Sequence, residues 1–130
     1  MTNKKNPAFA KAMAGKQTFV LSVGGSLICP DEVDVEFLKK FRALIFKKVQ
    51  EGNRFYIICG GGKVNSKYNE AAQKIAKVSD IDLDWLGIFA TRFNAQLMRV
   101  IFGDLAYSEV VIDPTKKIKT DKQIAKKHGG

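Results

Sequence analysis

Two clusters of small residues could bind an anion. Gly24-Gly25-Ser26 and Gly60-Gly61-Gly62 each come directly after a short apolar run. Glycines allow main-chain N–H groups to line a concavity, and a helix that begins at the second cluster would direct its positive end at phosphate oxygens. Each cluster alone could be only a tight strand-to-helix turn, because neither matches a Walker P-loop or a spaced GxGxxG. The two together favour a phosphate site.

Alternating strands and helices position these clusters. Asp34 is a favourable N-cap for an amphipathic helix, and Gly52 is a favourable stop for it. Apolar spacing predicts two further helices, the second of them long. The predicted strands are 17–23, 54–59 and 108–112, and the predicted helices are 35–50, 63–77 and 82–102.

This order of elements predicts an α/β fold. Two strand–helix–strand crossovers in succession imply a right-handed, mostly parallel sheet between layers of helices. Apart from Arg54, the run 54–59 is uniformly apolar, as expected of a strand that is buried on both faces. Both glycine clusters then lie at the carboxyl edge of the sheet, where open α/β folds bind ligands. Three strands are few for such a sheet, so we expect a truncated domain.

The formal net charge of +9 is concentrated at the two ends of the chain. Residues 1–16 carry four lysines and no acid, whereas residues 17–112 carry twelve basic and eleven acidic side chains. We therefore expect no specific nucleic-acid partner, although loose attraction to phosphate remains an alternative. The predicted organisation is a flexible basic tail at 1–16, a folded part at 17–113 and a basic C-terminal segment at 114–130.

Composition argues against several other classes of protein. No apolar run has the roughly eighteen residues of a membrane span, and the N-terminal residues lack the apolar core of a signal peptide. We expect a cytoplasmic protein without a membrane partner. Cys29 and Cys59 lack metal-ligand spacing, so we expect two buried free thiols and no protein-bound metal.

Three segments carry a resemblance to a known family. "VLSVGGSL", "IICGGGKVNSKY" and "DLDWLGIFATRFNAQLM", in this order, resemble the amino-acid-kinase superfamily and, within it, uridylate (UMP) kinases of the archaeal type. The resemblance implies a three-layer α/β/α sandwich that assembles as a homo-oligomer, usually a hexamer. It also implies transfer of the γ-phosphoryl of ATP to UMP with Mg²⁺, a step of pyrimidine nucleotide biosynthesis.

The resemblance also implies roles for the glycine clusters. Gly24, Gly25 and Ser26 would hold the phosphates of ATP through main-chain and hydroxyl donors. Gly61 would lie against UMP, and Gly62 would lie against the phosphoryl group in transfer. No side chain is identified as a catalytic acid or base, because positioning and charge neutralisation dominate phosphoryl transfer.

In the third segment, the resemblance implies that Asp84 accepts hydrogen bonds from the UMP ribose. The alternative is that this carboxylate only caps or compensates the start of a helix. The "ATRFNA" run is interpreted mainly as packing and assembly surface. A less favoured alternative is that Thr91, Arg92 and Asn94 bridge the helix to the nucleotide.

Two departures from the superfamily concern positive charge. Ser22 stands where many of these kinases place a lysine, but archaeal-type uridylate kinases also lack it. Ser66 stands where the family has a phosphate-contacting arginine, and a serine cannot supply a delocalised cation. Lys63 and Lys67 flank that position as candidate phosphate cations, although either could be an ordinary solvated helix residue.

The sequence ends about where the family continues into a Pro-Gly and Thr-Asp motif that contacts the nucleotides. We therefore expect the N-terminal, UMP-binding half of a UMP kinase, with negligible activity alone. Two alternatives remain open. One is another phosphotransferase of the superfamily, and the other is a non-catalytic module for nucleotide binding, anion binding or assembly.

Overall fold

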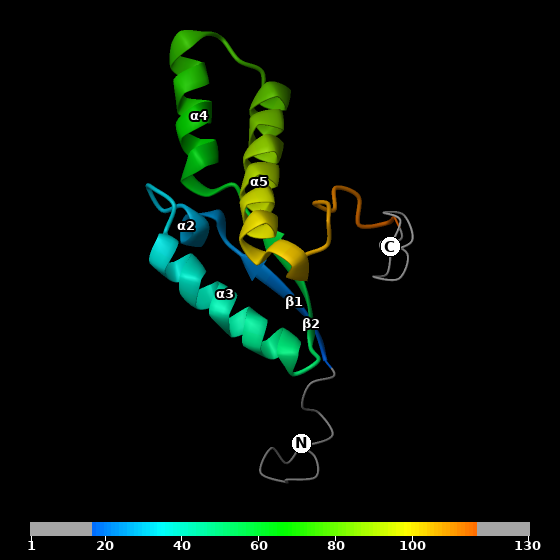
Figure 1. The fold of residues 1–130 in the computed structure, drawn as a ribbon. Helices are drawn as coiled ribbons and strands as arrows, with labels where there is room; N and C mark the ends of the chain where they lie inside the picture. The colour runs from blue at the N-terminus through cyan, green and yellow to red at the C-terminus, as the bar shows by residue number, and fades with distance from the viewer. Residues whose placement is uncertain (1–16, 117–130) are drawn as a thin grey trace, which may run out of the picture.

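The computed structural model describes residues 17–116, so the predicted segment 1–16 and most of 114–130 lie outside it. Figure 1 shows α4 and α5 as a helical hairpin at the end of the sheet, with α3 beside the strands. Of the helices in the described range, none is both long and apolar enough to cross a membrane. The elements are β1 (Thr18–Val23), α2 (Gly25–Ile28), α3 (Val35–Gln50), β2 (Arg54–Cys59), α4 (Gly62–Ile75), α5 (Asp80–Phe102) and the 3₁₀ turn η1 (Gly103–Leu105).

Strands β1 and β2 form a two-stranded parallel sheet. Thr18 lies opposite Arg54 at one end of the ladder, and Val23 lies opposite Cys59 at the other end. Helix α3 makes the crossover that parallel strands require. Because both strands end at the same edge of the sheet, the two glycine clusters lie side by side there. The predicted parallel α/β arrangement with a common carboxyl edge is confirmed.

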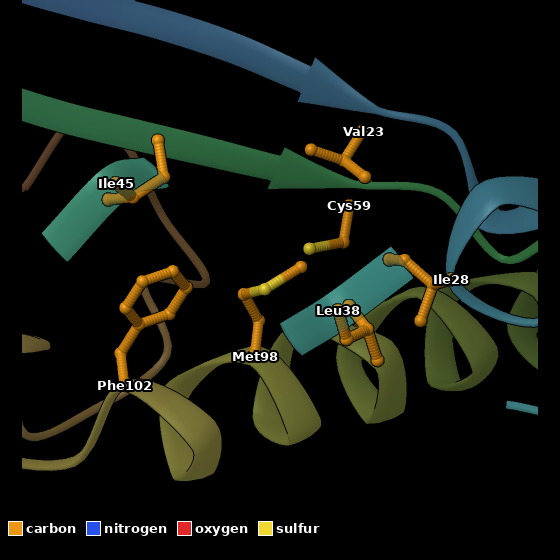
Figure 2. Close-up of a cluster of buried hydrophobic side chains, with 7 residues drawn as sticks. All are labelled: Val23, Ile28, Leu38, Ile45, Cys59, Met98 and Phe102. Atoms are coloured by element: carbon orange, nitrogen blue, oxygen red, sulfur yellow. The ribbon is translucent and has the colours of Figure 1, made fainter. Parts of the chain in front are cut away.

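Helices α3 and α5 pack against the same face of this sheet. Figure 2 shows Cys59 of β2 and Met98 of α5 pointing toward one another within the core. Ile28 of α2 is fully buried, which anchors the first glycine cluster to the core. The buried cluster consists of Val23, Ile28, Leu38, Ile45, Cys59, Met98 and Phe102.

The helix starts follow local capping chemistry. Asp34 Oδ1 accepts a hydrogen bond from Phe37 N at 3.0 Å, so the predicted N-cap of α3 is confirmed. Helix α5 begins earlier than predicted, because Ser79 Oγ accepts from Asp82 N at 3.2 Å and makes Asp80 the first helical residue.

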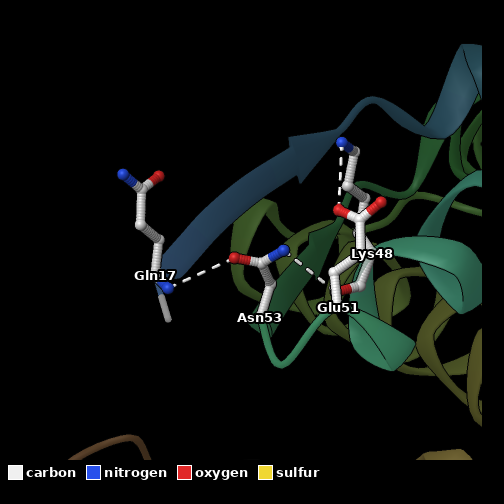
Figure 3. A network of polar contacts seen from close by, with 4 residues as sticks. All are labelled: Gln17, Lys48, Glu51 and Asn53. Atoms are coloured by element: carbon white, nitrogen blue, oxygen red, sulfur yellow. Dashed lines mark hydrogen bonds and ion pairs between the residues drawn. The ribbon is translucent and has the colours of Figure 1, made fainter. Parts of the chain in front are cut away.

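A buried amide joins the other ends of the two strands. Asn53 Oδ1 accepts from Gln17 N at 3.2 Å, and Asn53 Nδ2 donates to Lys48 O at 2.9 Å (Figure 3). Lys48 Nζ also pairs with Glu51 at 3.3 Å. These bonds connect the start of β1, the last turn of α3 and the start of β2.

Two predictions about the sheet fail within residues 17–116. Residues 108–112 form no strand, and Val111 and Ile112 stay 43% and 65% exposed. β-Branched residues favour a strand only where a neighbour pairs with them, and here the described residues offer no such neighbour. Nor is β2 covered on both faces, because α3 and α5 lie on one side and leave Tyr56 and Ile58 40% and 56% exposed.

Candidate phosphate-binding site

The two glycine clusters pack backbone against backbone. A Cβ atom added to Gly25 would collide with Gly62 N and lie 2.6 Å from Gly61 C. A Cβ atom on Gly62 would in turn lie 2.6 Å from Gly25 O. Contacts this short exclude any side chain at either position, so the glycines are required by the close approach of the two loops as well as by any ligand.

Asn94 ties the second cluster to helix α5. Its side chain is 4% exposed, and its Nδ2 donates to Gly60 O at 2.8 Å and to Gly61 O at 3.3 Å. Gly60 N donates to Val23 O at 3.1 Å and links the cluster back to β1. The sequence predicted a packing role for this segment, with bridging to the nucleotide as an alternative. The structure instead shows Asn94 bonded to the glycine loop itself.

The backbone of the second cluster turns sharply into α4. Gly61 has right-handed dihedrals, with φ −83° and ψ −31°, and Gly62 has a positive φ of 59°. A right-handed residue followed by a left-handed one gathers consecutive N–H groups into an anion-binding concavity. No side chain caps the start of α4. The N-terminal N–H groups of this helix are therefore not occupied by a capping side chain.

The first cluster presents Ser26 on the surface. Gly24 precedes the single turn α2 with an extended backbone, at φ −58° and ψ 143°, and Gly25 is buried beneath the second cluster. Ser26 is exposed at this edge. The structure thus brings together the five predicted positions of the two clusters, Gly24, Gly25, Ser26, Gly61 and Gly62, and what they bind remains a prediction.

Both candidate cations are bonded to one acidic residue. Lys63 Nζ lies 3.1 Å from Asp31 Oδ1, and Lys67 Nζ donates to Asp31 O at 3.3 Å. The side chains of Lys63 and Asp31 are 55% and 74% exposed, and a pair this exposed contributes little stability. The two lysines are therefore close to the glycine clusters, but they contact the loop between α2 and α3. Ser66 is exposed on α4.

Asp84 is exposed on α5 and takes no part in its cap. Ser79 is the N-cap, and the acidic residues of the first turn are Asp80 and Asp82. Helix-dipole effects fade beyond that turn, so the capping alternative does not explain Asp84. A Cβ atom on Gly61 would lie 3.6 Å from Gly87 O. Asp84 lies about 4.5 Å along the helix axis from Gly87, which is one turn from the residue that meets the second cluster.

Neighbouring polar side chains of α5 have other partners. Thr91 Oγ1 donates to Gly87 O of its own helix at 2.7 Å, and the Arg92 guanidinium lies 5.8 Å from the centre of the Phe89 ring. Gly87 allows the close approach of α4, since its added Cβ atom would lie 3.3 Å from Asn65 Nδ2. Thr91 and Arg92 therefore make contacts within α5 itself, in contrast to Asn94.

Cys59 lies beside the site but is not a suitable nucleophile. Burial raises the pKa of the Cys59 thiol above its ordinary value, so the thiol is protonated at neutral pH. Cys29 and Cys59 are both buried and free, as predicted. Within residues 17–116, no group of His, Cys, Asp and Glu side chains could hold a metal ion.

Comparison with known proteins places these residues in a sequence family. The profile of the "Amino acid kinase family" matches residues 17–128. The chain is 37% identical over 94 residues to the uridylate kinase of Thermococcus onnurineus and 38% identical over 94 residues to that of Pyrococcus abyssi. Each alignment covers 72% of this chain and 41% of the relative. The chain thus spans about two fifths of the length of these curated relatives.

Proposed function

The chain belongs to the amino acid kinase family, and from this premise we propose that it functions in a UMP kinase. In the proposed reaction a phosphate oxygen of UMP attacks the γ-phosphorus of ATP, the bond to the β,γ-bridging oxygen breaks, and UDP and ADP form. The observation that carries the proposal is the convergence of the two glycine clusters at one sheet edge. Such a reaction depends on positioning and charge neutralisation, which main-chain N–H groups can supply.

The proposed roles divide the site between the two nucleotides. Gly24, Gly25 and Ser26 bind the phosphates of ATP, and Gly62 binds the phosphoryl group in transfer. Gly61 contacts UMP. Asp84 accepts hydrogen bonds from the ribose of UMP, a role supported by its exposure near the second cluster and by its absence from the helix cap.

We expect Mg²⁺ to arrive with ATP as part of the substrate. Mg²⁺ keeps several waters and is usually held by substrate phosphates together with one or two carboxylates. The described residues contain no carboxylate cluster that would hold this ion alone, which fits binding through phosphate oxygens.

A specific observation favours a second candidate, a non-catalytic module that binds a nucleotide or another anion. Ser66 carries no positive charge, and both flanking lysines are bonded to Asp31. Charge stabilisation during transfer would require at least one lysine to leave Asp31. Because these contacts are exposed, the exchange costs little, and we retain the kinase as the main proposal.

We also propose a homo-oligomer in the cytoplasm that serves pyrimidine nucleotide synthesis. Support for assembly comes from α5, where Trp85, Phe89 and Phe93 form an aromatic stripe that is 50%, 60% and 70% exposed. Monomeric proteins rarely expose contiguous apolar surface of this kind, and a second copy of the same helix would cover it.

Calorimetric titration tests the proposed substrate class. The chain is titrated separately with ATP, UMP, CMP, acetylglutamate and isopentenyl phosphate, and UDP formation from ATP and UMP is followed in parallel. We expect ATP and UMP to bind and acetylglutamate not to bind. Because this half is expected to have negligible activity alone, the chemistry is tested on the chain completed by the C-terminal part of a related uridylate kinase. UMP binding without UDP formation by that completed chain would favour the non-catalytic module. Binding of acetylglutamate or isopentenyl phosphate in place of UMP would contradict the proposal.

A further inference from the structure

Both side-chain N–H donors of Asn94 bond to the second glycine cluster. A side-chain amide has two N–H donors on one nitrogen, and Asn94 Nδ2 lies 2.8 Å from Gly60 O and 3.3 Å from Gly61 O. The residue is 4% exposed, so neither bond competes with bulk water. Two consecutive peptide groups are therefore held by one buried side chain of α5.

These bonds determine which way two N–H groups point. In a planar trans peptide the C=O and the following N–H point in opposite directions, and the described residues contain no cis peptide. With the carbonyls of Gly60 and Gly61 turned toward Asn94, the N–H groups of Gly61 and Gly62 face away from α5. Among residues 17–116, neither N–H donates to an acceptor.

The first glycine cluster lies directly against one of these donors, Gly62 N. A side chain at position 25 would collide with Gly62 N, so glycine at this position leaves the nitrogen without a covering methyl group. Gly61 has φ −83° and ψ −31°, and Gly62 follows with a positive φ of 59°, which is the order of φ signs found in anion-binding concavities. The geometry is thus prepared before any ligand arrives.

We propose that Asn94 is a positioning residue, which orients the N–H groups of Gly61 and Gly62 toward a phosphoryl group of the bound nucleotide. The inference rests on the proposed function but concerns a residue to which that function gives no role. Asn94 does not contact the phosphoryl group. It acts through the two peptide planes, which would otherwise be free to rotate and to direct a carbonyl oxygen at the anion.

The competing explanation is that Asn94 only satisfies two buried carbonyls. Loss of the side chain would then lower stability without changing anion affinity in the folded protein. Asn53 provides a matched control, because it is also a buried asparagine with two hydrogen bonds, at 3.2 and 2.9 Å, but it lies at the opposite end of the sheet.

The experiment titrates Asn94→Ala, Asn53→Ala and the unmodified chain with inorganic pyrophosphate, which is followed by calorimetry and by the amide resonances of Gly61 and Gly62. We expect both resonances to shift in the unmodified chain, an affinity loss of about tenfold or more for Asn94→Ala, and a change within about twofold for Asn53→Ala. A folded Asn94→Ala chain that binds as well as the unmodified chain would overturn the inference.

Two further measurements keep the test decisive. If Asn94→Ala does not fold, the scalar coupling from Asn94 Nδ2 to the Gly60 carbonyl carbon is measured in the unmodified chain with and without pyrophosphate, and its absence in both states overturns the inference. If pyrophosphate binding depends on Asn94 but UMP does not bind, the UMP kinase proposal fails and the inference stands. If Asn94→Ala binds ATP and UMP as tightly as the unmodified chain does, only the inference fails.

Discussion

At the scale of the residue, the candidate site depends on a few polar side chains around a framework of glycines. Asp84 was identified from its sequence segment, and the structure explains why a cap cannot account for it, because Ser79 already fills that position. The contribution of Asn94 could not be predicted with the same clarity. Its hydrogen bonds cross 34 positions of sequence to Gly60, and no local pattern indicates such a contact.

Asp84→Asn is expected to weaken UMP binding and leave ATP binding nearly unchanged. The substitution keeps the shape of the side chain but removes the charge that strengthens its hydrogen bonds to the ribose. Hydrogen bonds to charged groups contribute about 1.5 to 3 kcal/mol, or roughly ten- to more than a hundredfold in affinity. Calorimetric titration measures both ligands. Asp82→Asn, in the first turn of the same helix, is the control, and equal effects of the two substitutions would refute the ribose contact.

Cys59 predicts a specific dependence of stability on pH. Burial raises the pKa of its thiol in the folded chain above the ordinary value of 9.0. The stabilising contribution of the neutral thiol is therefore complete below that value and is lost as the pH rises from it through the higher pKa of the folded chain, because the unfolded chain ionises first. Urea unfolding between about pH 7 and about pH 10 should show the stability advantage over Cys59→Ala decreasing. A constant difference would mean that the thiol is solvated in the fold.

At the scale of the element, the sequence predicted what local rules determine. Helix α3 has its predicted bounds because Asp34 caps its start, and β1 and β2 lie where apolar runs end in glycines. The prediction of a strand at 108–112 was wrong because strand formation depends on a pairing partner, which composition does not reveal. The close contact between Gly25 and Gly62 was equally beyond local rules, since it arises only when the two loops meet.

Gly25→Ala is expected to destabilise the fold and disrupt the site. Its methyl group would collide with Gly62 N and lie 2.6 Å from Gly61 C, so backbone must move. Overpacking of this kind costs about 1 to 3 kcal/mol in the free energy of unfolding. Gly24→Ala is the matched control, because its Cβ atom would meet nothing closer than Ser26 Oγ at 3.9 Å. If urea unfolding shows equal stability for the two variants, the loops are not packed as described.

At the scale of the whole molecule, apolar surface remains on both the sheet and the helical hairpin. On one face of the sheet, Val20 is 65% exposed and Ile58 is 56% exposed. On the hairpin, the aromatic stripe of α5 is exposed. The sequence pattern predicted that β2, which contains Ile58, is buried on both faces, because the pattern records the hydrophobicity of a side chain and not which surface covers it. Within residues 17–116, neither surface is covered.

Phe93→Glu is expected to reduce self-association. Phe93 is 70% exposed in the stripe, and a carboxylate there would have to be desolvated between two copies of α5. Sedimentation velocity should show a shift toward monomer by at least about tenfold in dissociation constant. Ile75→Glu, at a position on α4 that is 85% exposed, is the control and should leave association unchanged. Identical sedimentation of Phe93→Glu and the unmodified chain would place the interface elsewhere.

The most direct test of the central claim, that the two glycine clusters form one phosphate site, is an amide-resonance titration of the unmodified chain with ATP and Mg²⁺. The resonances of Ser26 and Gly62 report on the two clusters separately, although both clusters lie at one edge of the sheet. We predict that both resonances shift and that both curves give the same dissociation constant. A shift at only one cluster, or two different dissociation constants, would contradict a single shared site.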